Sequence, residues 1–389
     1  MLLDERPLID ETGITQWRHH LHAHPELLYD LHETAAFVAE KLSGFGCDEV
    51  ATGIGRTGVV GVVHGRSGPG GRMVGLRADM DALPIVEETG APYASTHKGV
   101  MHACGHDGHT AMLLGAAREL ARTRDFDGSV AFIFQPAEEG GAGARAMIED
   151  GLFERFPVER VFGLHNIPGM AIGSFAIRPG AMMAATDEFV ITLRGRGGHA
   201  AIPHRSLDPV LAGAALVQAL QQVVSRNVDP LESSVLSVTQ FHAGFIHNVI
   251  PDEAVISGTV RTLSRAVRDL TETRMREIVA GIAGAHGMEA DIAYDRNYPV
   301  TMNAPQEAQF CARIAGELVG EAAVDTGVAP LMAGEDFSYM LEEKPGAFIF
   351  MGNGDSAPLH NARYDFDDRA LAYGVSYWIR LAQAALGRN

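Results

Sequence analysis

The sequence predicts an α/β protein with two domains, on three observations. Short apolar segments alternate with amphipathic segments between about residues 33 and 180, as in a mostly parallel sheet covered by helices on both faces. The order then changes to a compact β-α-β-β-α-β pattern. At 389 residues the chain also exceeds the usual size of one hydrophobic core. We therefore expect an α/β domain, residues 1–180 and 298–389, interrupted by a ferredoxin-like domain, residues 181–297.

The expected helices and strands follow from the period of the apolar residues. In the α/β domain, helical spacing occurs at residues 33–42, 110–122, 142–150, 305–319 and 369–386. Continuous apolar segments predict its strands at residues 58–63, 73–79, 129–134, 160–165 and 346–352. In the inserted domain we expect strands at residues 188–195, 233–241, 253–262 and 288–294, and helices at residues 206–224 and 267–283.

Charge and composition limit the partners and the location of the chain. Its formal net charge of −18 repels phosphate backbones, so we expect no nucleic-acid partner. No uncharged apolar segment approaches the roughly 18 residues of a membrane span. Asp4 and Glu5 stand where a signal peptide needs a basic segment, so we expect a cytoplasmic protein with no membrane partner. The three cysteines are far apart in sequence and predict no disulfide framework, which leaves Cys104 free as a thiolate or a ligand.

Polar side chains that can bind metal follow several of the predicted strands. Asp79 and Asp81 follow one strand, Glu138 and Glu139 follow another, and His165 ends a third. In open α/β sheets, ligand sites form outside the carboxyl ends of the strands. Carboxylates and imidazole delivered to one edge by separate segments predict a metal or catalytic site there.

The stretch MHACGHDGHT, residues 101–110, adds a thiol and three imidazoles directly before a helix. Cys104 and His106 are two positions apart and can converge on one ion only from a loop, which Gly105 permits. His109 falls about where the helix begins and His102 precedes the loop, so we expect both to support the site. Thiolate with imidazole suits zinc or another first-row divalent ion, and added carboxylates extend the choice to manganese or cobalt.

Eight motifs occur in one order: RADMDALP, MHACGHDGHT, FQPAEEGGAGA, GLHN, GRGGHAAIPH, HNVIPDEA, GEDFS and PLHNARYDF. With them the chain, from about Arg18 to its C-terminus, resembles the amidohydrolase branch of the aminoacylase and carboxypeptidase metallopeptidase family. That branch contains hippurate hydrolases, indole-acetyl-amino-acid hydrolases and N-acyl-amino-acid deacylases. The resemblance implies a zinc-exopeptidase-like catalytic domain with two divalent ions (Mn, Zn, Co or Ni). It also implies that the inserted ferredoxin-like domain is a lid that forms homodimers.

Carried over motif by motif, the resemblance implies five metal ligands: Cys104, His106, Glu139, His165 and His360. Glu138, the first glutamate of AEE, becomes the general base. In other branches an aspartate bridges the two ions, and a histidine stands where this chain has Asp79. We therefore expect Cys104 to bridge the ions and His106 to compensate for the missing histidine. Asp79 and Asp81 are then expected to orient ligands without binding metal.

The implied reaction is hydrolysis of the amide bond of an N-acyl amino acid to a carboxylate and a free amino acid. A bound divalent ion lowers the pKa of its water to about 7, and Glu138 would pass the water's proton to the leaving amine. His199, in GRGGHAAIPH, resembles a histidine that reaches the partner subunit's active site and would stabilise the oxyanion. Arg261 is the candidate cation for the substrate carboxylate, with Asn248 as a hydrogen-bond donor. We assign no chemical step to GEDFS.

Three alternatives remain open at this point. A metallo-dipeptidase or aminopeptidase would use the same ions on unblocked small peptides. A thiol hydrolase would use Cys104 as its nucleophile and would be indifferent to chelators. A metal-storing or peptide-binding protein would keep the ligands without turnover, but it would not need Glu138.

Overall fold

The computed structural model describes residues 11–387, which form two compact units. The described part of the first unit consists of residues 11–182, 302–329 and 336–387, and the second consists of Met183–Thr301 and Pro330–Glu335. We did not expect Pro330–Glu335 in the second unit; the segment joins it because the amide of Ala184 lies within hydrogen-bond distance of the carbonyls of Leu331 and Ala333. The N-terminal residues that carry the cytoplasmic prediction lie outside the described range, so that location stays a prediction.

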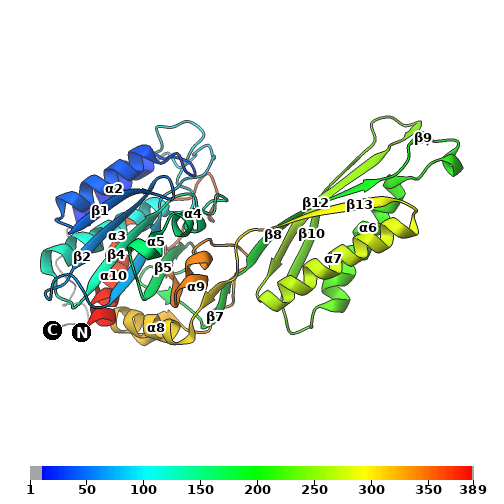
Figure 1. The fold of residues 1–389 in the computed structure, drawn as a ribbon. Coiled ribbons are helices and arrows are strands. Elements are labelled where there is room, and N and C mark those ends of the chain that lie inside the picture. Colours follow the sequence, from blue (N-terminus) through cyan, green and yellow to red (C-terminus); the bar gives the residue numbers. More distant parts are fainter. Residues whose placement is uncertain (1–10, 388–389) are drawn as a thin grey trace. The chain divides into compact units, whose positions relative to one another are not determined.

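The first unit is built on an eight-stranded sheet with the order β1-β2-β4-β3-β5-β16-β6-β15. Figure 1 labels β1, β2, β4 and β5 of this sheet. Its strands are β1 (Glu49–Ile54), β2 (Gly58–His64), β3 (Met73–Asp79), β4 (Ser129–Gln135), β5 (Arg160–Ile167), β6 (Phe175–Ala176), β15 (Val324–Asp325) and β16 (Gly346–Gly352). The neighbours β4, β3, β5 and β16 are parallel. The α/β fold class is therefore confirmed, with a parallel centre.

Both edges of this sheet differ from the expected parallel arrangement: at one edge β6 runs antiparallel to β16, and at the other the strands are β1 and β2. Strand β1 was not predicted, and β2 runs antiparallel to both β1 and β4. Only three residues separate β1 from β2, and so short a connection joins only antiparallel strands.

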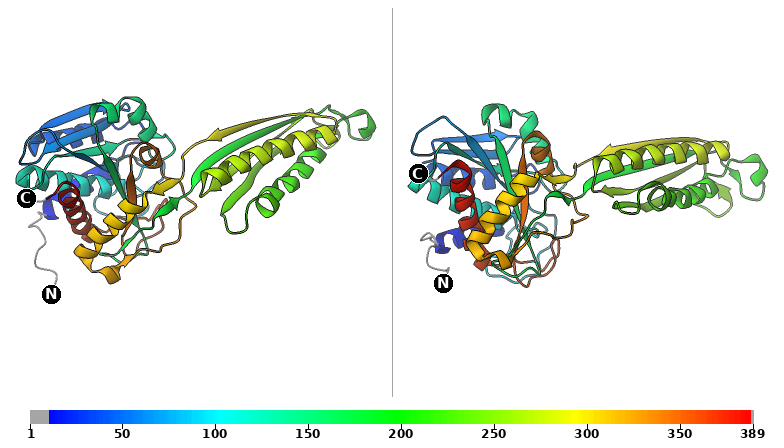
Figure 2. Two further views of the ribbon diagram at one scale, coloured as in Figure 1. Left: turned by 60° about the horizontal axis from the view of Figure 1, so that its bottom comes forward. Right: turned by 90° about the horizontal axis from the view of Figure 1, so that it is seen from below.

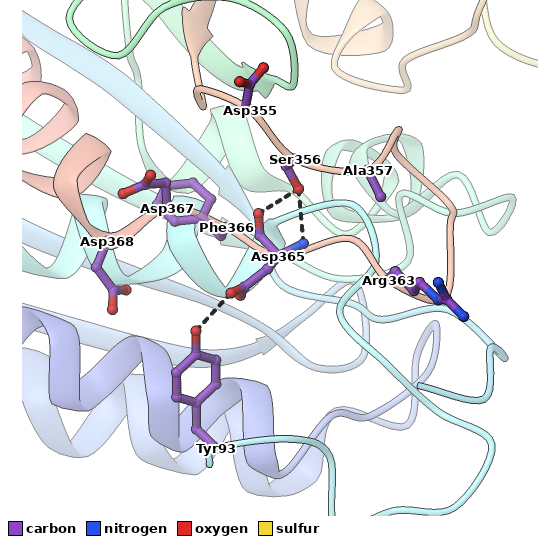
Figure 3. A pocket seen from close by; sticks show the side chains of 9 residues that line it. All are labelled: Tyr93, Asp355, Ser356, Ala357, Arg363, Asp365, Phe366, Asp367 and Asp368. Carbon is purple, nitrogen blue, oxygen red and sulfur yellow. Dashed lines mark hydrogen bonds between the residues drawn. The ribbon is translucent and has the colours of Figure 1, made fainter. Parts of the chain in front are cut away.

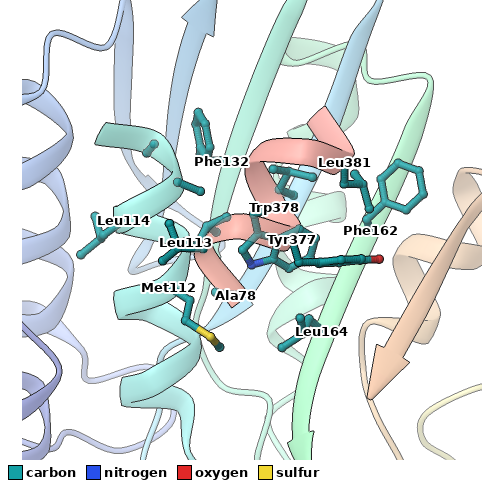
Figure 4. Packing of buried hydrophobic residues seen from close by; sticks show 14 of the residues in the cluster. Ala78, Met112, Leu113, Leu114, Phe132, Phe162, Leu164, Tyr377, Trp378 and Leu381 are labelled. Atoms are coloured by element: carbon teal, nitrogen blue, oxygen red, sulfur yellow. The ribbon is translucent and has the colours of Figure 1, made fainter. Parts of the chain in front are cut away.

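Helices cover both faces of the sheet (Figures 1 and 2). They are α1 (Glu11–Ala23), α2 (His32–Gly44), α3 (His106–Thr123), α4 (Gly143–Glu149), α5 (Leu152–Arg155), α8 (Pro305–Val319), α9 (Ser338–Glu343) and α10 (Leu371–Leu386). Helices α3 and α10 pack on the sheet and on each other, and the core between them contains Leu113, Phe132, Trp378 and Leu381 (Figure 4). This apolar packing fixes α3, whose first turn carries residues of the candidate site.

The second unit contains an antiparallel sheet with the order β10-β12-β8-β13. Its principal elements are β8 (Ala185–Arg194), α6 (Pro209–Gln222), β10 (Ser234–Ala243), β12 (Glu253–Thr262), α7 (Arg265–Ala285) and β13 (Glu289–Arg296). Alternate residues of β8 are buried beneath the two helices, as expected for a sheet covered on one face. This order of strands and helices is the ferredoxin-like plan.

Short elements complete the description. They are β7 (Gly180–Met183), β9 (Gly198–His199), η1 (Pro203–Arg205), η2 (Val223–Asn227), β11 (Val249–Ile250), β14 (Thr301–Asn303), η3 (Glu321–Ala323) and η4 (Asp368–Ala370). Among residues 11–387, no helix has the length and hydropathy that crossing a bilayer requires.

Candidate metal centre

The carboxyl ends of the four central parallel strands deliver donor side chains to one edge of the sheet. Asp79 is the last residue of β3, and His165 lies near the end of β5. Glu138 and Glu139 follow the end of β4, and His360 lies in the loop after β16. Because parallel strands end at the same edge, residues up to about 280 positions apart in sequence can meet there.

This edge also receives Cys104, which lies in the loop before α3, and His106, the first residue of that helix. The helix begins at His106, four residues before the predicted start at residue 110, because Gly105 adopts a left-handed conformation with φ +89° directly before it. A Cβ atom on Gly105 would lie 2.3 Å from Asn166 Nδ2 and 2.4 Å from Tyr364 Oη. Glycine is therefore required at this position for both its conformation and its size.

The five predicted ligands come together in two groups that share one atom. Cys104, His106 and His165 form one group, and Cys104, Glu139 and His360 form the other; the donor atoms in each lie within 4.8 Å of one another. Cys104 Sγ is 3.3 Å from His165 Nε2, and Glu139 Oε1 is 3.4 Å from His360 Nε2. A sulfur common to both groups is the arrangement needed for a donor that bridges two ions.

Hydrogen bonds to the backbone orient the two buried histidines. Nδ1 of His106 donates to the carbonyl of Asp81 at 2.8 Å, and Nδ1 of His165 donates to the carbonyl of Asn166 at 2.6 Å. Both rings therefore present Nε2 to the cluster. His106 Nε2 and Glu139 Oε1 are buried and have no hydrogen-bond partner among the described residues, although they lie 4.0 Å apart. Such unpaired buried donor atoms fit a bound cation.

The electrostatics of the cluster also fit a cation. Burial raises the pKa of the Cys104 thiol well above its usual range, and Glu139, Glu138 and Asp79 add to this. Burial lowers the pKa of His106, but Asp79 and Asp81 outweigh it and raise the pKa to about 10. A divalent ion would offset this accumulated negative charge. The raised pKa of Cys104 disfavours the thiol-hydrolase alternative, because a nucleophilic cysteine needs a stabilised thiolate.

Asp79 and His109 also lie near His106, but hydrogen bonds already occupy their polar atoms. Asp79 accepts from Arg77 Nη1 at 2.7 Å and from His109 Nδ1 at 2.6 Å. His109 Nε2 accepts from the backbone amide of Asn166 at 3.0 Å. The structure therefore agrees with a supporting role for both residues.

Asp81 also fits a supporting role, whereas neither ring nitrogen of His102 has a hydrogen-bond partner among the described residues. The two carboxylate oxygens of Asp81 accept the backbone amides of Glu138 and Glu139, each at 3.0 Å. This contact fixes the turn that carries the proposed base. His102 is buried and belongs to none of the donor groups among the described residues.

Four supporting residues were missed by the sequence interpretation. Asp107, next to His106, is buried and accepts from Arg18 Nη1 at 3.2 Å and from the ring of His22 at 2.8 Å. The four-residue spacing of Arg18 and His22 was a signal that they share a helix face. Asn166 donates to the carbonyl of Cys104 at 2.7 Å, and its place in GLHN was the only signal for it.

The other three predicted residues lie in the second unit. His199 is exposed on β9, and the carbonyl of Asn248 accepts the amide of Ala200 at 3.0 Å, so these two predicted residues are near each other. Arg261 is half-buried at the other end of the unit, where β12 pairs it with Thr186 at the start of β8. Burial lowers the pKa of Arg261.

A cavity of about 430 Å³ adjoins the loop that carries His360, but none of the five predicted ligands lines it (Figure 3). Its walls are Tyr93, Asp355, Ser356, Ala357, Arg363, Asp365, Phe366, Asp367 and Asp368. Tyr93 Oη donates to Asp365 at 2.9 Å, and Arg363 pairs with Glu88. Four carboxylates around one exposed arginine disfavour an anionic substrate, so we separate this cavity from the candidate metal centre.

An α/β unit with thiol, imidazole and carboxylate donors at its strand ends has the construction of a metal-dependent hydrolase. The chain belongs to the peptidase family M20/M25/M40, whose model matches residues 75–384. It is similar to hippurate hydrolase of Campylobacter jejuni, with 48% identity over 365 residues and 94% of each chain covered. It is also similar to N-acyl-L-amino acid amidohydrolase of Geobacillus stearothermophilus, with 47% identity over 300 residues, covering 76% of this chain and 80% of the relative.

The solved structures include a protein with the same fold and a described metal content. The YXEP protein of Bacillus subtilis, described as a dinuclear metal binding peptidase from the M20 family, is 33% identical. The match has a TM-score of 0.85 and covers 97% of this chain and 99% of that one. With the two relatives, this match confirms the amidohydrolase branch predicted from the motifs.

Proposed function

We propose that this chain is a dinuclear metal-dependent amidohydrolase that removes the acyl group from an N-acyl amino acid. The observation that carries the proposal is the position of Cys104 Sγ, which is shared by two donor groups, one with His106 and His165 and one with Glu139 and His360, while Glu138 lies in a further group with His106 and Glu139. Relatives named hippurate hydrolase and N-acyl-L-amino acid amidohydrolase support the substrate class.

The five donors divide between two ions in this proposal. Cys104, His106 and His165 would hold one ion, and Cys104, Glu139 and His360 would hold the other. Mixed sulfur, nitrogen and oxygen donors suit Zn, Co, Ni and Mn, and availability in the cell then decides among them.

When bound, the two ions supply an activated water and polarise the substrate carbonyl. Glu138, which is 8% exposed, accepts the proton of the attacking water and delivers it to the leaving nitrogen. A carbon–oxygen bond forms and the amide carbon–nitrogen bond breaks, which yields a carboxylate and a free amino acid. Asp81 supports this step because it holds the amides of Glu138 and Glu139.

Arg261 is the proposed anchor for the substrate carboxylate. Its guanidinium donates to Thr259 Oγ1 and, at 2.9 Å, to the carbonyl of Val260, but it forms no ion pair with a carboxylate among the described residues. This observation disfavours an ordinary salt bridge within the second unit. A half-buried guanidinium whose contacts are neutral can still take an anion in two hydrogen bonds.

His199 and Asn248 are proposed to act in the active site of a partner subunit, as the oxyanion donor and a substrate donor. Arg261 pairs with Thr186 at the start of β8. His199 follows Arg194, the last residue of β8, so the length of this strand separates the two residues. Eight residues of strand span roughly 26 Å, far more than one small substrate. His199 and Arg261 can therefore contact the same N-acyl amino acid only if they come from two chains, which supports a homodimer.

Mixing two inactive variants tests the shared site. His199→Ala and Glu138→Ala subunits should each be inactive, whereas random exchange between them should restore about one quarter of the wild-type activity. Half of the exchanged dimers would then contain one complete site. Absence of restoration after subunit exchange has been confirmed by mass spectrometry would show that each site is complete within one chain.

The function itself is tested with chelator-treated enzyme and defined ions. EDTA should abolish hydrolysis, and Mn²⁺, Co²⁺, Zn²⁺ or Ni²⁺ should restore it on N-acetyl and N-benzoyl amino acids. Faster hydrolysis of unblocked dipeptides would favour the dipeptidase or aminopeptidase alternative. Full activity after removal of metal, confirmed by elemental analysis, would contradict the proposal.

A further inference from the structure

Asp336, in the GEDFS segment to which no chemical step was assigned, forms a buried polar cluster beside the proposed base. It is fully buried, and donors from three segments reach its carboxylate. Arg77 Nη2 donates to Oδ1 at 3.0 Å, and Gln135 Nε2 lies 2.8 and 2.9 Å from the two oxygens. The backbone amide of Ala144 donates to Oδ2 at 2.9 Å. The carboxylate therefore ties the ends of β3 and β4 to the start of α4.

The turn between β4 and α4 carries Glu138 and contains unusual backbone conformations. Ala137 and Ala142 both have φ +55°, a left-handed conformation that costs free energy for a residue with a Cβ atom. Such a turn keeps one shape only where its surroundings hold it. Asp81 holds the amides of Glu138 and Glu139 from one side, and Asp336 holds Gln135 and Ala144 at the two ends.

Asp336 also contacts the base directly through its backbone. Its amide donates to Glu138 Oε1 at 3.4 Å. The three donors to its side chain fix the position of this amide. The same residue therefore holds both the turn that carries the base and one oxygen of the base itself.

We propose that Asp336 is a positioning residue that holds the Glu138 carboxylate in line with the attacking water. This inference rests on the proposed function, in which Glu138 is the general base. A misplacement of about 1 Å at a reacting group can lower a rate by about 100-fold. Loss of the cluster would therefore lower kcat by shifting the Glu138 carboxylate. Asp336 is fully buried and acts through Glu138, so we assign it no contact with substrate and do not count it as a catalytic residue.

Asp336→Asn is the informative substitution. The amide keeps the shape of the side chain but turns one acceptor into a donor. Both carboxylate oxygens accept N–H groups here, so either orientation of the asparagine places N–H against N–H. We expect kcat to fall by about 100-fold, with KM and metal content changed by less than about twofold.

Repeating the substitution in the Glu138→Ala background separates positioning from a structural role. If Asp336 acts through Glu138, Asp336→Asn should lower the residual kcat of Glu138→Ala by less than about twofold. An equal loss in both backgrounds, or an unchanged kcat in the wild-type background, would overturn the inference. A Glu138→Ala enzyme with the wild-type rate would instead contradict the proposed function, and the inference would fall with it.

Two further variants keep the experiment decisive. Glu307→Gln is the matched control, because it also replaces a carboxylate with an amide. Glu307 pairs with Arg160, which starts β5, whereas His165 lies near the end of that strand. This variant should leave kcat unchanged. If Asp336→Asn does not fold, Gln135→Met removes one donor to Asp336 and retains a side chain of similar length. It should lower kcat about fivefold in the wild-type enzyme but not in Glu138→Ala. An unchanged kcat in the wild-type enzyme, or the same loss in both enzymes, would overturn the inference.

Discussion

Glu138→Ala is expected to lower kcat on N-acyl amino acids by about 1,000-fold while each subunit keeps its metal ions. The side chain is buried beside the donor cluster, and in the proposed mechanism it accepts the proton of the attacking water. Removing it takes away proton transfer but none of the five proposed ligands. Steady-state kinetics and elemental analysis of the same preparation measure the two effects separately.

Glu139→Ala is the matched control for this experiment, because it removes the same functional group one residue later. Glu139 Oε1 lies 3.4 Å from His360 Nε2 and belongs to a donor group with Cys104. This variant should lose metal as well as activity. Metal loss in Glu138→Ala but not in Glu139→Ala would mean that the roles of base and ligand are exchanged, and equal metal loss in the two variants would mean that Glu138 is also a ligand.

Cys104→Ala is expected to have the largest effect on metal binding. Loss of a residue that only orients a metal ligand typically weakens metal affinity 10- to 100-fold. Loss of a ligand shared by two ions should therefore weaken metal affinity by more than about 100-fold. Metal content should fall for both sites, together with activity. A variant that still binds two ions with wild-type affinity would contradict the bridging role.

Two other cysteine substitutions sharpen this prediction. Cys311 is also fully buried but lies in the apolar core on α8, so Cys311→Ala should keep both ions. Cys104→Asp supplies the bridging carboxylate found in other branches of the family. It should retain part of the metal and shift the preference from zinc toward manganese, because carboxylate oxygen is a harder donor than thiolate.

The sequence predicted much of this fold because its apolar pattern is strong and local. The helix over residues 305–319 and the strand over residues 346–352 have the predicted bounds. Strand β1 was missed because it lies at the edge of the sheet with only two of its six residues buried, which leaves a weak apolar pattern. The antiparallel direction of β2 was missed because direction depends on connection length and on partners, not on the apolar pattern. The start of α3 was placed late because it depends on the left-handed conformation of Gly105, which Asn166 and Tyr364 crowd.

The sequence by itself determined which donor types this protein has and that the carboxyl ends of its strands deliver them. The sequence interpretation assigned His106 as a ligand and His109, three positions later, as a supporting residue, but only the tertiary structure gives the physical reason for the difference. Nδ1 of His106 is held by the carbonyl of Asp81, which leaves its Nε2 facing the cluster, whereas Nε2 of His109 accepts the amide of Asn166. A ring nitrogen that already accepts a hydrogen bond cannot also bind metal. That distinction depends on Asn166, which is 57 positions from His109 in sequence, and no local pattern contains it.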